Sequence, residues 1–286
     1  MNGNKFSEII NTAAEEHGFF IKSTSPLSGG DINDVFLIET GTGKLVIKIN
    51  DASRYPGMFE AEKAGLDALR KPKIIDVPET LFTGEAHQQS YLMLKFLETG
   101  TKTSDFWEIF GKQMAQLHRI SAETFGFETD NYIGSLPQYN SKEKSAAEFY
   151  INQRLEPQLK MAAEKSYNLG NTDGFLKNCA EIIPDEAPAL IHGDLWNGNY
   201  ITNASGMPAL IDPAVAYAPR EMDLGMMKLF GGFNAELFKS YEAHYPLQDG
   251  FEERVPIWQL YYLLVHLNIF GTGYKASVEK IIRCFS

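Results

Sequence analysis

Two acidic residues and one amide, placed behind short apolar runs, form the strongest chemical signal in the sequence. Asp194 and Asn199 follow the run that ends at Ile191, and Asp212 follows a second apolar run. Phosphoryl transfer uses a carboxylate to accept the proton of an attacking hydroxyl, and oxygen ligands to hold Mg²⁺ against nucleotide phosphates. We therefore predict that Asp194 is the catalytic base and that Asn199 and Asp212 are metal ligands. Each residue alone fits an ordinary turn, but the combined spacing is typical of kinase catalytic loops.

Lys48 is the predicted phosphate-binding cation. It lies in the apolar run 46–49 and faces away from its isoleucine neighbours, as in a strand. In the helix predicted over 58–69, Glu62 falls within the apolar stripe, whereas Glu60 lies on the solvated side. Because an unpaired buried carboxylate costs several kcal/mol, we expect Glu62 to pair with Lys48.

Two N-terminal segments are expected to contact the nucleotide. Gly29 and Gly30 precede a predicted strand, and backbone amides without a Cβ can approach phosphate closely. A simple turn is the alternative, since the third glycine of a GxGxxG pattern is missing. Farther along, the backbone of Lys95, Phe96 and Leu97 is expected to hydrogen-bond an adenine.

Length and patterning favour two lobes. The chain has 286 residues, enough for two domains or for one domain of two lobes. We expect an α+β, protein-kinase-like fold, with a small β-rich lobe at 1–97 and a larger helical lobe at 98–286 that carries the catalytic loop and the acceptor site. A cleft between them is the expected ligand site. The predicted elements are strands at 34–39, 44–50 and 91–97, helices at 58–69, 106–117 and within 257–270, and a hairpin of 199–202 with 209–211.

Charge and cysteine content restrict the partners. Lys and Arg total 26 against 37 Asp and Glu, and the resulting net charge of −11 disfavours nucleic acid and anionic membranes. The most apolar stretch, 257–270, is interrupted by polar residues and is too short for a membrane span. We expect no secretory signal, because residues 1–10 lack the apolar h-region that such a signal needs. Cys179 and Cys284 suggest neither a disulfide framework nor a zinc site. A reducing cytoplasm is the expected location, and no pattern indicates an oligomeric state.

The segment behind Asp212 indicates the kind of acceptor. Only residues 213–219 separate Asp212 from Arg220, and they contain no Ser or Thr. An activation loop that is ordered by phosphorylation does not fit there, so we expect a small-molecule acceptor. Asp223 and His192 are expected to be structural residues: Asp223 either caps the helix that begins near Arg220 or supports the catalytic loop, and His192 packs under that loop.

Several motifs resemble those of the fructosamine and ketosamine 3-kinases, within the wider superfamily of aminoglycoside phosphotransferases and choline kinases. The resemblance extends over residues 27–270. Lys48 and the aspartates are shared by the superfamily, whereas the segment at 130–134 and the Trp at 196 are typical of the ketosamine kinase branch. The motifs are Gly29-Gly30-x-Ile32-Asn33, Met58-Phe59-x-x-Glu62, Asp130-Asn131-Tyr132-Ile133-Gly134, His192-Gly193-Asp194-Leu195-Trp196 and Asp212-Pro213-Ala214.

This resemblance implies ATP-dependent phosphorylation, with Mg²⁺, of the sugar 3-hydroxyl of ketosamines, either small adducts or glycated protein lysines. The 3-phosphate would make the adduct prone to lose its sugar, which is a deglycation repair. Trp196 would then stack on the sugar chain, with plain packing as the alternative. Two other functions remain open: a kinase for an aminoglycoside, choline or a hydroxy-amino acid, and a nucleotide-binding pseudokinase.

Overall fold

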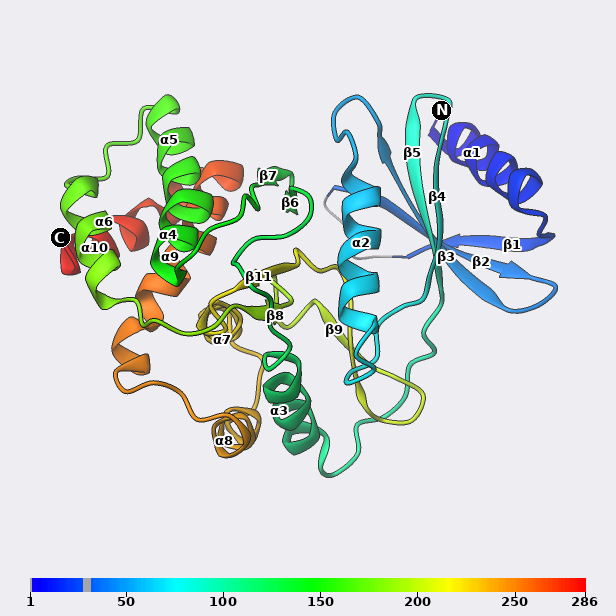
Figure 1. Ribbon diagram of the computed structural model, residues 1–286. Coiled ribbons are helices and arrows are strands. Elements are labelled where there is room, and N and C mark those ends of the chain that lie inside the picture. Colours follow the sequence, from blue (N-terminus) through cyan, green and yellow to red (C-terminus); the bar gives the residue numbers. More distant parts are fainter. Residues whose placement is uncertain (1, 28–31) are drawn as a thin grey trace.

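An antiparallel sheet forms the centre of the N-terminal lobe. The computed structural model describes residues 2–27 and 32–286. The five-stranded sheet has the order β1-β2-β3-β5-β4 (Figure 1). In β3, Ile47 and Ile49 are fully buried on one face of the sheet, and the side chain of Lys48, which is also buried, lies on the other face. The strands are β1 (Ile21–Pro26), β2 (Asp34–Thr40), β3 (Lys44–Asp51), β4 (Thr80–Ala86) and β5 (Gln89–Lys95).

Two helices cover this sheet from opposite sides (Figure 1). α1 (Asn2–His17) packs Ile9 and Ala13 against the outer face, in one cluster with Ile47. α2 (Met58–Arg70) lies on the side of the second lobe and buries its apolar stripe there. The alternation of side chains along the strands therefore produces two separate cores.

The C-terminal lobe is mostly helical and also contains three short two-stranded sheets. β8 pairs with β11, β9 with β10, and β6 with β7, all antiparallel. The helices are α3 (Phe106–Leu117), α4 (Ala146–Tyr150), a π-helix (Ile151–Leu155), α5 (Glu156–Glu164), α6 (Thr172–Ile182), α7 (Glu221–Leu229), α8 (Ala235–His244), α9 (Phe251–Phe270), a 3₁₀ turn (Thr272–Tyr274) and α10 (Lys275–Cys284). The strands are β6 (Asn131–Ile133), β7 (Leu136–Gln138), β8 (Ala189–Ile191), β9 (Tyr200–Thr202), β10 (Pro208–Leu210) and β11 (Ala216–Ala218).

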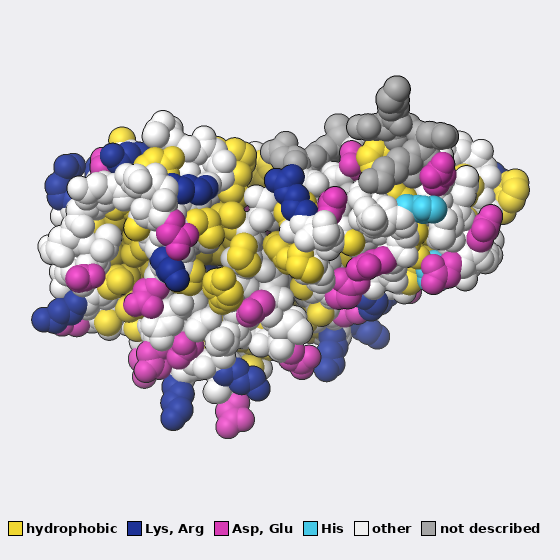
Figure 2. Space-filling model, turned by 90° about the horizontal axis from the view of Figure 1, so that it is seen from above, with side chains coloured by type: hydrophobic (Ala, Val, Ile, Leu, Met, Phe, Trp, Pro, Cys, Tyr) yellow, Lys and Arg dark blue, Asp and Glu magenta, His cyan; other side chains and the backbone are white. Residues whose placement is uncertain are grey.

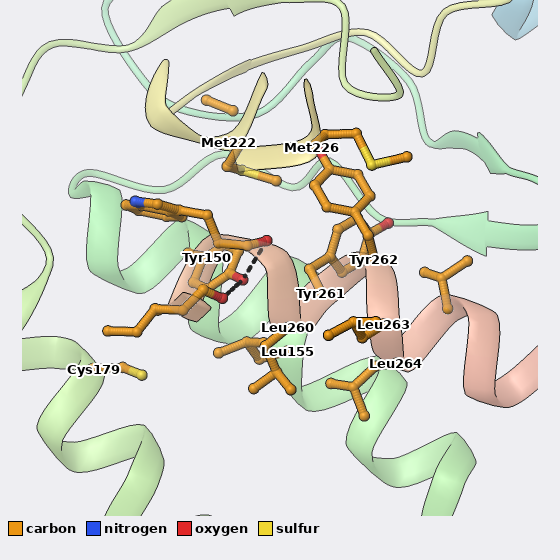
Figure 3. Close-up of a cluster of buried hydrophobic side chains, with 14 of the residues drawn as sticks. Tyr150, Leu155, Cys179, Met222, Met226, Leu260, Tyr261, Tyr262, Leu263 and Leu264 are labelled. Atoms are coloured by element: carbon orange, nitrogen blue, oxygen red, sulfur yellow. Dashed lines mark hydrogen bonds between the residues drawn. The ribbon is translucent and has the colours of Figure 1, made fainter. Parts of the chain in front are cut away.

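Helix α9 is the central element of this lobe. Its Leu260, Tyr261 and Leu264 are almost completely buried among neighbouring helices (Figure 3). The buried hydroxyl of Tyr150 donates to the carbonyl of Ile257 at 2.6 Å, so the polar atom is satisfied inside an apolar core (Figure 3). None of the helices in the described part of the chain is long and apolar enough to cross a membrane.

The predicted two-lobed arrangement is confirmed, with additions. The strands at 34–39 and 44–50, the helices at 58–69 and 106–117, and the hairpin of β9 with β10 all form. The strand predicted at 91–97 runs over Gln89–Lys95 instead, because the chain leaves the sheet after Lys95. Helix α1, strands β1 and β4, and the pairs β6–β7 and β8–β11 were not predicted.

Candidate active site

A single cavity of about 670 Å³ between the lobes brings the predicted chemical groups together. Hydrophobic side chains are visible where the two lobes meet on the face shown in Figure 2. The cavity is contiguous from the buried lysine of β3 to the aromatic residues of α9. Its lining includes Lys48, Glu62, Asp194, Trp196, Asn199 and Asp212.

The catalytic loop begins where β8 ends, and Gly193 gives it its path. Gly193 has φ +82°, and a Cβ at this position would lie 2.0 Å from the carbonyl oxygen of Ala214. The amide of Ala214 in turn donates to the carbonyl of His192 at 2.9 Å. Only glycine allows this approach, which places Asp194 beside the segment that follows Asp212.

Asp223 and His192 hold the catalytic loop in place through hydrogen bonds, which agrees with the structural role predicted for them. The two carboxylate oxygens of Asp223 accept the backbone amides of His192 and Gly193, each at 2.8 Å. Burial alone would raise the pKa of Asp223, but hydrogen bonds and the charge of His118 outweigh burial and lower it. His192 Nε2 donates to the carbonyl of Ile211 at 2.9 Å, so this ring is a structural support.

Asp194 and Asn199 form a direct pair. The amide nitrogen of Asn199 donates to the Asp194 carboxylate at 3.1 Å and to the Asp194 carbonyl at 2.8 Å. Burial raises the pKa of Asp194 well above its usual value, the Asn199 hydrogen bond opposes this shift, and the charges of Asp212 and Asp223 add to it. A carboxylate with a raised pKa, within reach of a cavity, is suited to accept a proton.

Lys48 connects the two lobes. Its Nζ lies 2.6 Å from Glu62 Oε1 and 2.6 Å from Asp212 Oδ1, so the predicted pair with Glu62 is confirmed. Although burial would lower the pKa of Lys48, the charges of Asp212 and Glu62 outweigh it, and the pKa is raised. Lys48 therefore carries a positive charge in the lining of the cavity. Glu60 is exposed, as predicted.

Comparison with known proteins assigns the family. Residues 4–285 match the sequence profile described as fructosamine kinase. The chain belongs to the fructosamine kinase family. It is 37% identical over 266 residues to a probable ketoamine kinase of Enterococcus faecium, covering 91% of this chain and 94% of that protein. It is 35% identical over 272 residues to the chloroplastic protein-ribulosamine 3-kinase of Arabidopsis thaliana, covering 92% and 82%. The resemblance seen in the sequence is confirmed.

Solved structures agree with this assignment. A fructosamine-3-kinase candidate from Haemophilus somnus has a TM-score of 0.88 and 30% identity, over 97% of this chain and 96% of that one. An aminoglycoside phosphotransferase, at 15% identity, has a TM-score of 0.64 over 96% of this chain and 98% of that one. The fructosamine kinase fold therefore extends to that more distant group of enzymes.

The fructosamine kinase site has the oxygen donors that a hard cation requires. The amide nitrogen of Asn199 is used by Asp194, so the amide oxygen is the atom of Asn199 that can bind a metal. Asp212 supplies a carboxylate, and 42% of its side chain is exposed. In the described residues no group of three or more His, Cys, Asp or Glu could hold a metal. Two protein oxygens completed by substrate phosphates are the mode that Mg²⁺ commonly uses, so the residues fit this ion.

The three residues predicted to contact an adenine lie outside the cavity that holds the other described site residues. Lys95, Phe96 and Leu97 do not line the cavity. The amide of Lys95 donates to the carbonyl of Glu79 at 2.9 Å, and that of Phe96 donates to Lys44 at 3.2 Å. These two N–H groups already have backbone partners, so the expected hydrogen bond to an adenine from the backbone of this segment stays a prediction that would use other backbone atoms. A contact through Leu97 stays a prediction, and Gly29 and Gly30 lie outside the described residues.

The hairpin β6–β7 is one part of the site whose role was not predicted. Asn131 and Tyr132 line the cavity. Asn131 Nδ2 donates to the carbonyl of Val215 at 2.9 Å, and the Tyr132 hydroxyl donates to the carbonyl of Pro56 at 3.0 Å. The hairpin thus contacts both lobes. The motif at 130–134 was the sequence signal for this hairpin. It indicated the family, but it did not show that these residues lie in the cavity.

Proposed function

We propose that this fructosamine kinase transfers the γ-phosphoryl group of ATP to the 3-hydroxyl of ketosamines. The observation that carries the proposal is the convergence of Asp194, Asn199, Asp212 and Lys48 on one cavity. The names of the relatives, ketoamine kinase and protein-ribulosamine 3-kinase, support a ketosamine as the acceptor. An aminoglycoside phosphotransferase of the same fold was crystallised as a ternary complex with ADP and hygromycin B, which supports a nucleotide and a sugar bound together.

In the proposed reaction the acceptor hydroxyl gives its proton to Asp194, and its oxygen attacks the γ-phosphorus in line with the leaving group. The bond between phosphorus and the β–γ bridging oxygen breaks, and ADP leaves. Lys48, oriented by Glu62, holds the nucleotide phosphates. Mg²⁺ bound by Asn199 and Asp212 would offset the phosphate charge.

Other parts of the proposal concern the whole chain. We place the lobe boundary after Leu97, so that residues 1–97 cover the nucleotide and 98–286 hold the catalytic loop and the acceptor. Trp196, 40% exposed in the cavity lining, would stack on the sugar chain. The reduced Cys179 and Cys284 are compatible with the predicted cytoplasmic location.

An acceptor panel tests the function. The purified protein, with ATP and MgCl₂, is expected to phosphorylate ribuloselysine or fructoselysine, and mapping of the product should place the phosphate on the 3-hydroxyl. Choline, an aminoglycoside and a hydroxy-amino acid serve as competing acceptors. Preferential turnover of one of these would assign another kinase activity. Transfer at background level with every acceptor would support a pseudokinase.

Asp194→Asn tests the role of the base. General bases contribute roughly 10² to 10⁴ in rate, so kcat is expected to fall at least about a hundredfold. Asparagine keeps the size of the side chain and an oxygen that can accept from Asn199, so ATP should still raise the melting temperature. Turnover near that of the unmodified enzyme would remove Asp194 from the role of base.

A further inference from the structure

Part of the cavity is not needed for phosphoryl transfer and has a different chemical character. Phe230 and Phe270 line the end of the cavity formed by the C-terminal lobe, and they are 41% and 59% exposed. Large apolar side chains exposed singly are common, but several around one cavity mark a binding surface. Trp196, near the catalytic base, also lines the cavity and is exposed.

His266 joins the two phenylalanines into one surface, which we name the aromatic wall (Phe230, His266 and Phe270). The ring centroid of His266 lies 5.0 Å from that of Phe230 and 5.5 Å from that of Phe270. Its Nδ1 donates to the carbonyl of Tyr262 at 2.7 Å, which fixes the ring. Burial lowers the pKa of His266, so the aromatic wall is uncharged near neutral pH.

The aromatic wall and Asp194 line the same cavity, and this restricts what can lie against the wall. In a ketosamine the amine is bonded to C1, two carbons from the carbon that bears the 3-hydroxyl. With that hydroxyl at Asp194, the amine and its substituent must occupy another part of the same cavity. The cavity, of about 670 Å³, must hold the nucleotide phosphates as well as the acceptor. The residues of the aromatic wall come from the C-terminal lobe, whereas the phosphate-binding Lys48 and its partner Glu62 come from the N-terminal lobe, so the wall is available to the acceptor.

Resting on the proposed function, we propose that the aromatic wall is the subsite for the amine substituent of the ketosamine and that it takes an uncharged hydrocarbon chain. The methylenes of a lysine side chain have this chemistry. Apolar rings gain free energy by covering methylenes, and they attract the cationic amine through their faces. They offer no partner to an anionic substituent. Arg54 lines the cavity from the N-terminal lobe, over the ring of Tyr55, and so the test includes an anionic adduct.

The test compares ribulose adducts of methylamine, propylamine, hexylamine and glycine. We expect kcat/KM to rise about two- to fourfold for each methylene that reaches the wall, from the free energy of covering a CH₂ group. The gain should appear in KM, because the wall touches no reacting atom. The glycine adduct should not exceed the methylamine adduct. Equal kcat/KM for all the alkyl adducts, or a preference for the glycine adduct, would overturn the subsite.

Variants connect the effect to the wall. In Phe230→Ala and Phe270→Ala the ratio of kcat/KM between the hexylamine and methylamine adducts should fall at least about threefold, whereas Phe20→Ala should keep it. Phe20 is 75% exposed and does not line the cavity. Because this ratio is taken within one protein, a partly unfolded sample does not alter it. An unchanged ratio in both wall variants would overturn the inference while leaving the kinase function intact. If the enzyme phosphorylated none of the adducts, both the proposed ketosamine kinase function and the subsite would be wrong.

Discussion

Gly193 is the residue at which the catalytic loop touches the segment behind Asp212. In Gly193→Ala the new Cβ meets the Ala214 carbonyl oxygen, a backbone atom that cannot turn away, at a φ of +82°. We expect the free energy of unfolding to fall by at least about 3 kcal/mol, the sum of backbone strain and overpacking. Urea unfolding measures this.

Gly18→Ala is the matched control for that variant. Gly18 also has a positive φ, +71°, but nothing lies within 4 Å of its added Cβ. It should lose only about 1–2 kcal/mol, the cost of a left-handed conformation for a residue with a side chain. Equal losses in Gly193→Ala and Gly18→Ala would show that the contact with Ala214 is not what requires glycine.

The buried imidazole of His192 is expected to make the free energy of unfolding decrease at acid pH. Its Nε2 donates to Ile211, and its Nδ1 accepts the amide of Asp194 at 3.3 Å, so protonation would cost a hydrogen bond. Burial lowers the pKa of His192 below 6.5 in the folded state. The unfolded chain therefore binds the proton first, and stability that is complete above about pH 6.5 falls as the pH decreases toward the folded pKa.

His192→Gln should reduce that acid sensitivity, since glutamine can donate to the Ile211 carbonyl without titrating. Between pH 7.5 and pH 5 the unmodified protein should lose up to about 2 kcal/mol more than His192→Gln, the linkage limit for one proton. Denaturant unfolding at both pH values gives the comparison, and His87→Gln, an exposed site, controls for removal of a histidine. The same pH dependence in all three proteins would exclude His192 as the titrating group.

At the residue scale the sequence predicts contacts that depend on one element at a time. The apolar stripe of α2 placed Glu62 inward, and the pair with Lys48 followed. The second partner of Lys48 in this structure, Asp212, is 164 positions away. That contact depends on how the two lobes are placed, and no local pattern reports it.

At the element scale, the hairpin β6–β7 holds the segment that carries Asp212. Asn131 Nδ2 donates to the buried carbonyl of Val215, and Asn131 Oδ1 accepts a hydrogen bond from Gln138 at 2.7 Å. Asn131→Ala leaves that carbonyl unpaired, so we expect a loss of about 1–3 kcal/mol in unfolding free energy and a reduced kcat. Thermal unfolding and an activity assay measure both.

Tyr132→Phe, on the same hairpin, is the control for that variant. It removes an exposed hydrogen bond to Pro56 and keeps the ring, which packs at 6.3 Å from that of Tyr55. A loss below about 1 kcal/mol is expected. If Asn131→Ala were as mild as Tyr132→Phe, the hairpin would not be what positions Asp212.

The helices and strands that the sequence analysis did not predict were missed for different reasons. The strands β6 and β7 have three residues each, and Pro137 interrupts the second, so neither gives a readable alternation. Helix α1 was missed although the sequence carries a signal for it. Ile9, Ile10 and Ala13 have helical spacing, and all three pack on the sheet. Strand β8 was recognised as an apolar run, but its partner β11 is a distant segment.

At the scale of the whole molecule, the two lobes share a core. Phe59 and Leu66 of α2 belong to one cluster with Leu190 of β8 and Leu195 of the catalytic loop. An added Cβ at Gly65 would lie 3.0 Å from Val215, so α2 approaches the segment behind Asp212 closely. The lobe boundary in the chain therefore does not separate two independent folding units, and a change at the cavity should affect both lobes.

Asp212 is the C-terminal lobe's partner of Lys48 and the predicted metal ligand, so it should couple nucleotide binding to the stability of the whole molecule. A ligand at a hundred times its Kd stabilises a protein by about 2.7 kcal/mol. The unmodified protein should therefore melt at a higher temperature with ATP and MgCl₂ than with ATP and EDTA. Asp212→Ala should abolish this Mg²⁺-dependent difference, because it removes the carboxylate that holds the ion while Lys48 keeps Glu62. Asp185→Ala, which removes an exposed carboxylate outside the cavity, should preserve it. An unchanged difference in Asp212→Ala would count against its role as a ligand and would move the metal to other oxygens of the cleft.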